Sequence, residues 1–224
     1  MDTARRVLTV AAAAAIAVWA SYEAVRYGIA GAVAGTAMRE LSAPSRTDGV
    51  VPVGSWWAND LDHAASMSPK DPALHELRSL AVVRSTRDPV ELKQAQGDLV
   101  AALQARPGSP YAWSNLAELK YLIGETGPVF ESALVNAARL GPFEPEVQRT
   151  VVQYGLAVID EVGPAAREAI DRMLAAGMRR NAAEMLTIAS RRGRLDAACR
   201  HLDGVPRPAV SKWTHLCQSM EATS

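Results

Sequence analysis

After residue 55 the chain is a succession of short helical segments separated by proline and glycine. The clearest pattern predicts a helix over residues 144–161, in which apolar side chains recur every three or four residues, at Val147, Val151, Tyr154, Val158 and Val162. Such a stripe is typical of the core-facing side of an amphipathic helix. Glycine and proline separate the further helices that we expect, at 165–177, 180–192, 194–202 and 208–219.

The first forty residues have a different pattern, because residues 7–22 carry no charge and follow the basic pair Arg5 and Arg6. This run is short for a spanning helix, which needs about 17–25 apolar residues. However, no proline interrupts the chain before Pro44, so the helix is expected to continue beyond the run. We interpret residues 1–41 as a cytoplasmic N-terminus, a transmembrane signal anchor and a helical extension.

The far end of this segment has residues suited to a lipid boundary. Glu23 and Arg26 are spaced to pair on one helix face, and the aromatic residues nearby are those of an interfacial belt, Trp19, Tyr22 and Tyr27. The positive-inside rule then keeps the N-terminus in the cytoplasm and exports everything after the helix. Two other interpretations stay open. Residues 18–20 fit the cleavage site of a removable signal peptide, and a buried Ala-rich core helix would leave the arginine pair unexplained.

Residues 42–55 contain two prolines and two glycines and are expected to form a linker. Downstream of it, three stretches each place an alanine five positions before a proline, at Ala64, Ala102 and Ala137. The prolines stand 38 and then 35 residues apart, close to the period of about 34 residues of tetratricopeptide (TPR) repeats.

One stretch resembles a TPR unit most clearly. Its first helix has the expected bulky and small residues, Trp113, Leu116 and Ala117, and its second helix has Phe130, Leu134 and Ala137. In such a unit the small residues let two helices cross closely, and the tryptophan fills the gap between neighbouring units. We therefore expect an all-α protein with TPR-like helix pairs over 56–142 and a C-terminal region, 143–224, that completes an α-solenoid.

Composition is consistent with this fold and restricts the classes of partner that we expect. The 24 basic residues balance 24 acidic ones, which argues against a nucleic-acid ligand. Alanine contributes 41 of the 224 residues while aromatic residues make up 5%, a mixture that favours close-packed helices over sheets. Two cysteines are too few for a disulfide-dense scaffold.

Motifs of catalysis are missing from the sequence. It has no glycine-rich phosphate loop, no Gly-x-Ser-x-Gly elbow and no His-Glu-x-x-His zinc helix. We therefore expect no enzymatic activity, no catalytic residue, no cofactor and no bound metal.

One constellation stands apart, because Cys199 and His201 mirror His215 and Cys217 about a centre near Pro208. Two helices in a hairpin would bring Cys199 to Cys217, and an exported domain permits a disulfide between them. Free buried thiols are the second interpretation. A zinc site is the third, but on a helix residues two apart point in nearly opposite directions, which keeps the four side chains from converging.

The expected mode of action is groove binding, in which stacked helix pairs accept an extended segment or a helix of a protein partner. In the best repeat the first helix offers Asn115, Lys120 and Tyr121 as partner-binding candidates. Plain surface exposure is the alternative for each of them.

The order of anchor, linker and degenerate repeats, with the run Ala-Arg-Leu-Gly-Pro-Phe-Glu-Pro-Glu-Val at 138–147, resembles a bacterial family. It is the VpsP-like group of small inner-membrane proteins associated with exopolysaccharide biosynthesis. The resemblance implies a single-pass inner-membrane protein whose periplasmic domain binds protein partners in a polysaccharide machine. It transfers no catalytic residue. The alternative is a general envelope scaffold for secretion, division or cytochrome maturation, and a glycan-acting enzyme is a more remote one.

Overall fold

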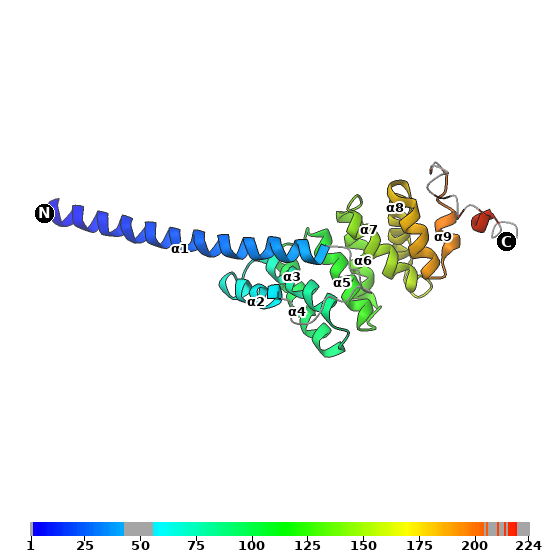
Figure 1. Ribbon diagram of the computed structural model, residues 1–224, viewed down its shortest axis with the longest axis horizontal. Helices are drawn as coiled ribbons and strands as arrows, with labels where there is room; N and C mark the ends of the chain where they lie inside the picture. The colour runs from blue at the N-terminus through cyan, green and yellow to red at the C-terminus, as the bar shows by residue number, and fades with distance from the viewer. Residues whose placement is uncertain are drawn as a thin grey trace. The chain divides into compact units, whose positions relative to one another are not determined.

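The computed structural model describes residues 2–42 and 56–203, together with Val205, Val210, Trp213 and residues 215–218. This part of the chain contains helices and turns and no strand, so the predicted all-α class is confirmed. The helices are α1 (Asp2–Ser42), α2 (Trp56–Met67), α3 (Pro72–Ser85), α4 (Pro89–Ala105), α5 (Pro110–Leu122), α6 (Pro128–Leu140), α7 (Pro145–Ala157), α8 (Pro164–Arg191) and α9 (Leu195–Cys199) (Figure 1). Residues 43–55 of the expected linker, and part of the expected helix at 208–219, lie outside the described residues.

The chain divides into two compact units. The N-terminal unit, Met1–Thr86, holds α1, α2 and α3, and the C-terminal unit, Arg87–Ser224, holds α4 to α9. The division falls inside the region 56–142 that the sequence groups into one set of helix pairs.

Proline sets the start of every helix from α3 to α8, at Pro72, Pro89, Pro110, Pro128, Pro145 and Pro164. Proline is favoured at the first helical position because its missing N–H would have no partner there and its φ angle already suits a helix. In three of these helices the preceding side chain accepts a backbone N–H from the first turn, at Asp71, Asp88 and Ser109. The regularly spaced prolines of the sequence, Pro69, Pro107 and Pro142, follow α2, α4 and α6, and in each case a second proline three residues later starts the next helix.

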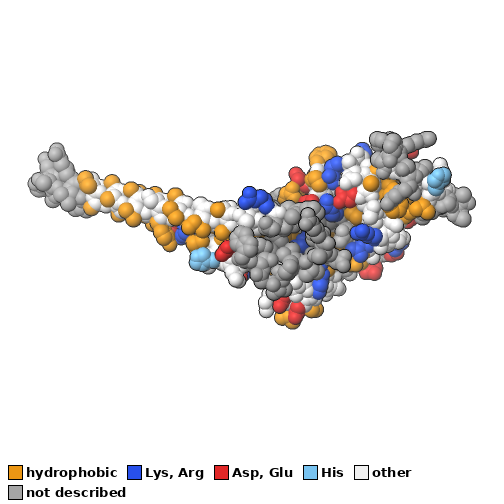
Figure 2. All heavy atoms as spheres, in the orientation of Figure 1, with side chains coloured by type: hydrophobic (Ala, Val, Ile, Leu, Met, Phe, Trp, Pro, Cys, Tyr) orange, Lys and Arg blue, Asp and Glu red, His pale blue; other side chains and the backbone are white. Residues whose placement is uncertain are grey.

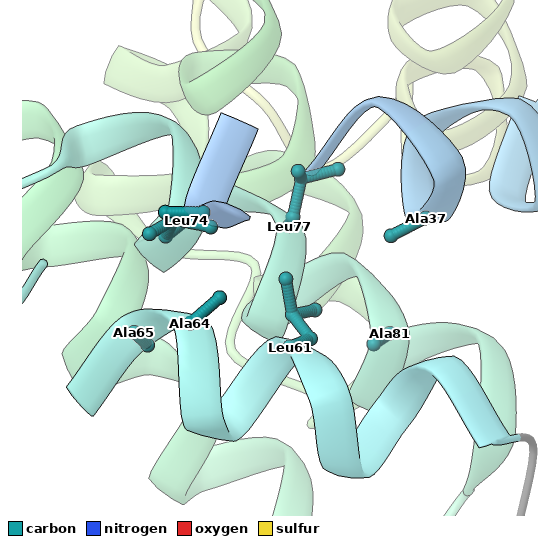
Figure 3. Close-up of a cluster of buried hydrophobic side chains, with 8 residues drawn as sticks. Ala37, Leu61, Ala64, Ala65, Leu74, Leu77 and Ala81 are labelled. Carbon is teal, nitrogen blue, oxygen red and sulfur yellow. The ribbon is translucent and has the colours of Figure 1, made fainter. Parts of the chain in front are cut away.

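The core of the N-terminal unit lies where the second half of α1 packs against α2 and α3. Small residues of α1 and α2 face leucines of α2 and α3, as Figure 3 shows for Ala37, Ala64, Leu61, Leu74 and Leu77. All five are buried, with exposed fractions of 5% or less. Alanine lets the helices approach closely, and leucine supplies most of the apolar surface removed from water.

In the C-terminal unit α5 and α6 each pack on the next helix and on the next but one. α5 packs against α6 and α7, and α8 packs against α7 and α6. The predicted small positions Ala102, Ala117 and Ala137 are buried, as is the whole predicted stripe from Val147 to Val162. These predictions of inward-facing residues are confirmed.

The predicted helix 144–161 is too long by four residues at its C-terminal end. α7 ends at Ala157, and Val158 leaves the helical region of backbone space with φ −128°. Glu161 then donates its backbone N–H to the Val158 carbonyl oxygen in a turn that leads to the next helix. Val158 and Val162 lie beyond the end of α7 and are still buried, so apolar periodicity alone overestimates the length of the helix.

The chain reverses at Asn181 inside α8, and the predicted helix end at Gly177 is wrong. Asn181 has non-helical angles, φ −148° and ψ 75°, and its side chain accepts the Glu184 backbone N–H at 3.4 Å. A Cβ built on Gly177 would lie 2.5 Å from the Met185 sulfur. Because residues eight apart on a straight helix are about 12 Å apart, the two segments must fold back on each other. Gly177 therefore serves a close helix contact, and Asn181 caps the second segment.

Candidate functional site

Of the three partner-binding candidates on α5, Lys120 is directed into the protein. Its Nζ donates to Gln96 Oε1 of α4 at 3.0 Å and to Glu125 Oε2 in the loop before α6. The residue is 6% exposed, whereas Asn115 and Tyr121 remain half-buried. Lys120 therefore ties α4 to the α5–α6 loop, and Asn115 and Tyr121 are the two candidates that reach the surface.

The sequence contains a signal that predicts this position of Lys120. It follows Leu116 by four residues and Ala117 by three, which places it on the core-facing stripe of α5. The hydrogen bond from Lys120, followed by its positive charge, lowers the pKa of Glu125 below the ordinary value, and Lys93 contributes less to the same effect. The Lys93 Nζ lies 3.7 Å from Glu125 Oε1. Glu125 is thus held as a carboxylate beside two lysines.

Tyr121 belongs to an aromatic and charged cluster, here called the Tyr–Arg cluster, that also contains Tyr154, Arg192 and Glu118. The two tyrosine rings are 5.0 Å apart, and the Arg192 guanidinium lies 5.7 Å from the Tyr121 ring centre and 5.9 Å from that of Tyr154. The Tyr154 hydroxyl donates to Glu118 Oε1 at 2.6 Å. The cluster joins α5, α7 and the end of α8.

The two ends of the Tyr–Arg cluster differ in exposure. Glu118 is 4% exposed and lies buried at the Tyr154 hydroxyl, while Tyr121 and Arg192 are half-buried at the outer end. Arg192 makes no ion pair with any residue in the described part of the chain. A cation held over two aromatic faces is positioned with little freedom left to lose on binding. Neither Arg192 nor Glu118 is among the partner-binding candidates that the sequence suggests.

The structure joins Cys199 of α9 to Cys217 by a disulfide with a Cα–Cα separation of 5.5 Å. Both cysteines are buried. His201 lies beside them in sequence but pairs with Asp171 of α8 at 2.8 Å, and His215 is exposed. The four residues of the mirror-image pattern do not converge, and the described residues contain no group of three or more His, Cys, Asp or Glu side chains arranged to hold a metal ion.

α1 exposes apolar side chains over its first half, visible as orange spheres along the free helix (Figure 2). Every described residue from Thr9 to Tyr22 is exposed, including the aromatic Trp19 at 66% and Tyr22 at 62%. The second half is different, because a stripe from Ala30 to Ala37 packs against the rest of the N-terminal unit. By length and hydropathy together, none of the described helices qualifies as a membrane span.

An open hollow of about 390 Å³ lies between α6 and the start of α8. Glu131 is the titratable residue of its lining, and its Oε2 already accepts the Gly163 backbone N–H at 3.0 Å. That carboxylate satisfies the first turn of α8, which would otherwise have an unpaired donor.

No family model, curated protein or solved structure matches the chain.

Proposed function

We propose that the protein is a membrane-anchored periplasmic adaptor, in which α1 holds a TPR-like helical-repeat domain that binds protein partners of an exopolysaccharide biosynthesis or export machine. The observation that carries the proposal is the exposure of α1 on all sides from Thr9 to Tyr22. A helix that is apolar all round is unsuited to water. Moving one exposed Val or Ile side chain fully into an apolar environment is favourable by roughly 1.5–3 kcal/mol.

Three further observations support the anchor and its orientation. The basic pair Arg5 and Arg6 precedes the apolar run, as expected for an N-terminus retained in the cytoplasm. Trp19 and Tyr22 stand at the other end of the run, where interfacial aromatic residues belong. The buried Cys199–Cys217 disulfide fits an oxidising compartment such as the periplasm.

The repeat architecture is supported by the packing of α5 to α8. Contacts of each helix with its next and next-but-one neighbour are those expected of stacked TPR-like pairs. Buried alanines lie at the predicted crossings, Ala117 in α5 and Ala137 in α6. In such a stack the first helices of successive pairs line a shared surface, and α5 and α7 hold the Tyr–Arg cluster at that position.

The polysaccharide role is supported by the resemblance to VpsP-like proteins, centred on residues 138–147. Photo-crosslinking tests it in the native bacterium, with a photoreactive phenylalanine derivative at Tyr121 in the full-length chain. Arg139 is the matched control, because it lies exposed on α6 away from the Tyr–Arg cluster. We expect Tyr121 to crosslink a glycosyltransferase, polymerase or export subunit, and Arg139 not to do so.

Other outcomes of this experiment discriminate between functions. Crosslinks to secretion, division or cytochrome-maturation proteins would favour the general envelope scaffold. Equal crosslinking from Tyr121 and Arg139 would remove the Tyr–Arg cluster from the proposal. Glycan-modifying activity of the purified chain would contradict an adaptor role.

A further inference from the structure

The environment of α1 changes within one helical turn. Thr9 to Tyr22 are exposed on every side, whereas Glu23, Arg26, Ala30, Val33, Ala34 and Ala37 are half-buried or buried. These six residues recur every three or four positions and so share one face of the helix. From Ala30 onward that face packs on α2 and α3, so the free part of α1 passes into the core of the N-terminal unit about one helical turn beyond Arg26.

The length of the free part matches the thickness of a bilayer core. Arg6 and Glu23 are 17 residues apart, which is about 25 Å along a helix, and Arg6 and Arg26 are about 30 Å apart. The hydrocarbon core is about 30 Å thick. If the basic pair marks one boundary, the opposite boundary falls at Glu23–Arg26, and packing against the N-terminal unit follows at Ala30, about 6 Å further along the helix.

The side chains at this level have the chemistry of the headgroup layer. The Arg26 Nη1 donates to Glu23 Oε1 at 3.1 Å, and the Arg26 guanidinium lies 5.7 Å from the Tyr27 ring centre. Tyr22 and Tyr27 are exposed on either side of this ion pair. Paired charges and amphipathic rings are stable among lipid phosphates and unfavourable in the hydrocarbon.

We propose that the N-terminal unit lies directly on the periplasmic surface of the bilayer and contacts phospholipid headgroups, with Glu23 and Arg26 at the level of the phosphates. The inference rests on the proposed function, since it requires α1 to span the membrane. Its physical basis is geometric: packing starts at Ala30, about 6 Å beyond Arg26, so α2 and α3 have no long stretch of helix that would lift them away from the bilayer. The bilayer surface is therefore a binding partner of this unit.

Energy transfer from the N-terminal unit to labelled lipids tests the proposal. The full-length chain carries a single added cysteine, His63→Cys, at an exposed position of α2, and is inserted into phosphatidylethanolamine and phosphatidylglycerol vesicles with acceptor lipids. The native cysteines form the disulfide and leave this one thiol to label with a donor. We expect strong transfer, because the donor lies close to the headgroups.

Two insertions of the same seven helix-forming residues provide the contrast. Placed after Tyr22, the insertion lengthens α1 by about 10 Å while nearly preserving its facing direction, so transfer should fall. Placed after Ser42, beyond the packed part of α1, it should leave transfer unchanged. Equal transfer in the parent chain and the Tyr22 insertion would overturn the proposal.

A separate readout distinguishes failure of this inference from failure of the anchor. Quenching of Trp19 fluorescence by brominated lipid reports insertion of α1, with a Trp19→Phe variant to identify its signal among the five tryptophans. Quenching of Trp19 combined with weak energy transfer would show that α1 is inserted but that the N-terminal unit does not lie on the bilayer surface. Absence of Trp19 quenching contradicts the anchor itself. The face of α1 that carries Gly28, Gly31 and Gly35 has no neighbouring atoms, so a second copy of the chain could pack there in place of lipid. Crosslinking between copies at this face, together with loss of energy transfer to lipid, would also overturn the proposal.

Discussion

Gly155 lies at a close contact of α7 with α8, and replacing it with alanine tests how tightly these helices pack. A Cβ on this residue would lie 2.4 Å from Ile170 Cγ1 and 2.7 Å from Ile170 Cδ1. Optimal carbon contacts are about 3.5–4.0 Å, so the isoleucine would have to move by more than about 1 Å. Overpacking of this kind costs about 1–3 kcal/mol, and the better helix propensity of alanine returns at most about 1 kcal/mol. We expect Gly155→Ala to lower the free energy of unfolding by about 1–2 kcal/mol.

Gly97 supplies a matched control, because it also lies inside a helix but has no atom within 4 Å of the position that a Cβ would occupy. Gly97→Ala should therefore raise the free energy of unfolding by about 0.5–1 kcal/mol. Urea unfolding of the full-length chain in mild detergent, followed by circular dichroism, measures both. Equal stabilisation by the two substitutions would refute the close α7–α8 contact.

A double-mutant cycle adds a second test of the same contact. Ile170→Ala alone removes a buried side chain and should cost about 2–5 kcal/mol. With Ile170 shortened, the alanine at position 155 has room, so the double variant should be more stable than the sum of the single effects by roughly 1–3 kcal/mol. Additive effects would show that the two residues do not touch.

Three further predictions follow from the C-terminal unit. Reduction of the Cys199–Cys217 disulfide, which spans 18 residues, should destabilise the protein by about 3 kcal/mol in urea titrations with and without reductant. The Cys199→Ser/Cys217→Ser variant should show no effect of reductant. Lys120→Met should raise the pKa of Glu125 toward its ordinary value in NMR titration of the carboxyl carbon, and an unchanged pKa would contradict the hydrogen bond as its main cause. Because the folded-state pKa is lowered, the stabilising contribution of Glu125 is present above the ordinary pKa and is lost as the pH falls through the lowered value. Asn181→Ala should cost about 1 kcal/mol through loss of the helix cap, measured by thermal unfolding, whereas a neutral effect would argue against the reversal there.

Helix content and inward-facing residues follow from the sequence because they depend on local periodicity. The stripe from Val147 to Val162 and the small positions Ala117 and Ala137 are buried as predicted. Helix ends are harder to predict, since a glycine serves either as a terminator or as a contact point. Gly177 is a contact point for Met185, a role that depends on a residue of the segment that packs back against it.

The candidate site shows the same limit. Tyr121 is half-buried on α5, and the cluster it joins also needs Tyr154 and Arg192, which are 33 and 71 residues away in the chain. The inward direction of Lys120 follows from its spacing to Leu116 and Ala117, but its partners Gln96 and Glu125 do not follow from any local pattern. Such groupings depend on how α4, α5, α7 and α8 pack, and no local pattern encodes that arrangement.

Membrane fractionation of the native bacterium combined with protease treatment of spheroplasts tests the central claim, a periplasmic adaptor held by α1, most directly. We predict that the full-length chain stays with the membrane after alkaline carbonate extraction and that protease added outside the inner membrane degrades the part after Ser42. Release of the chain by carbonate, or protection of the domain until the inner membrane is lysed, would contradict the account.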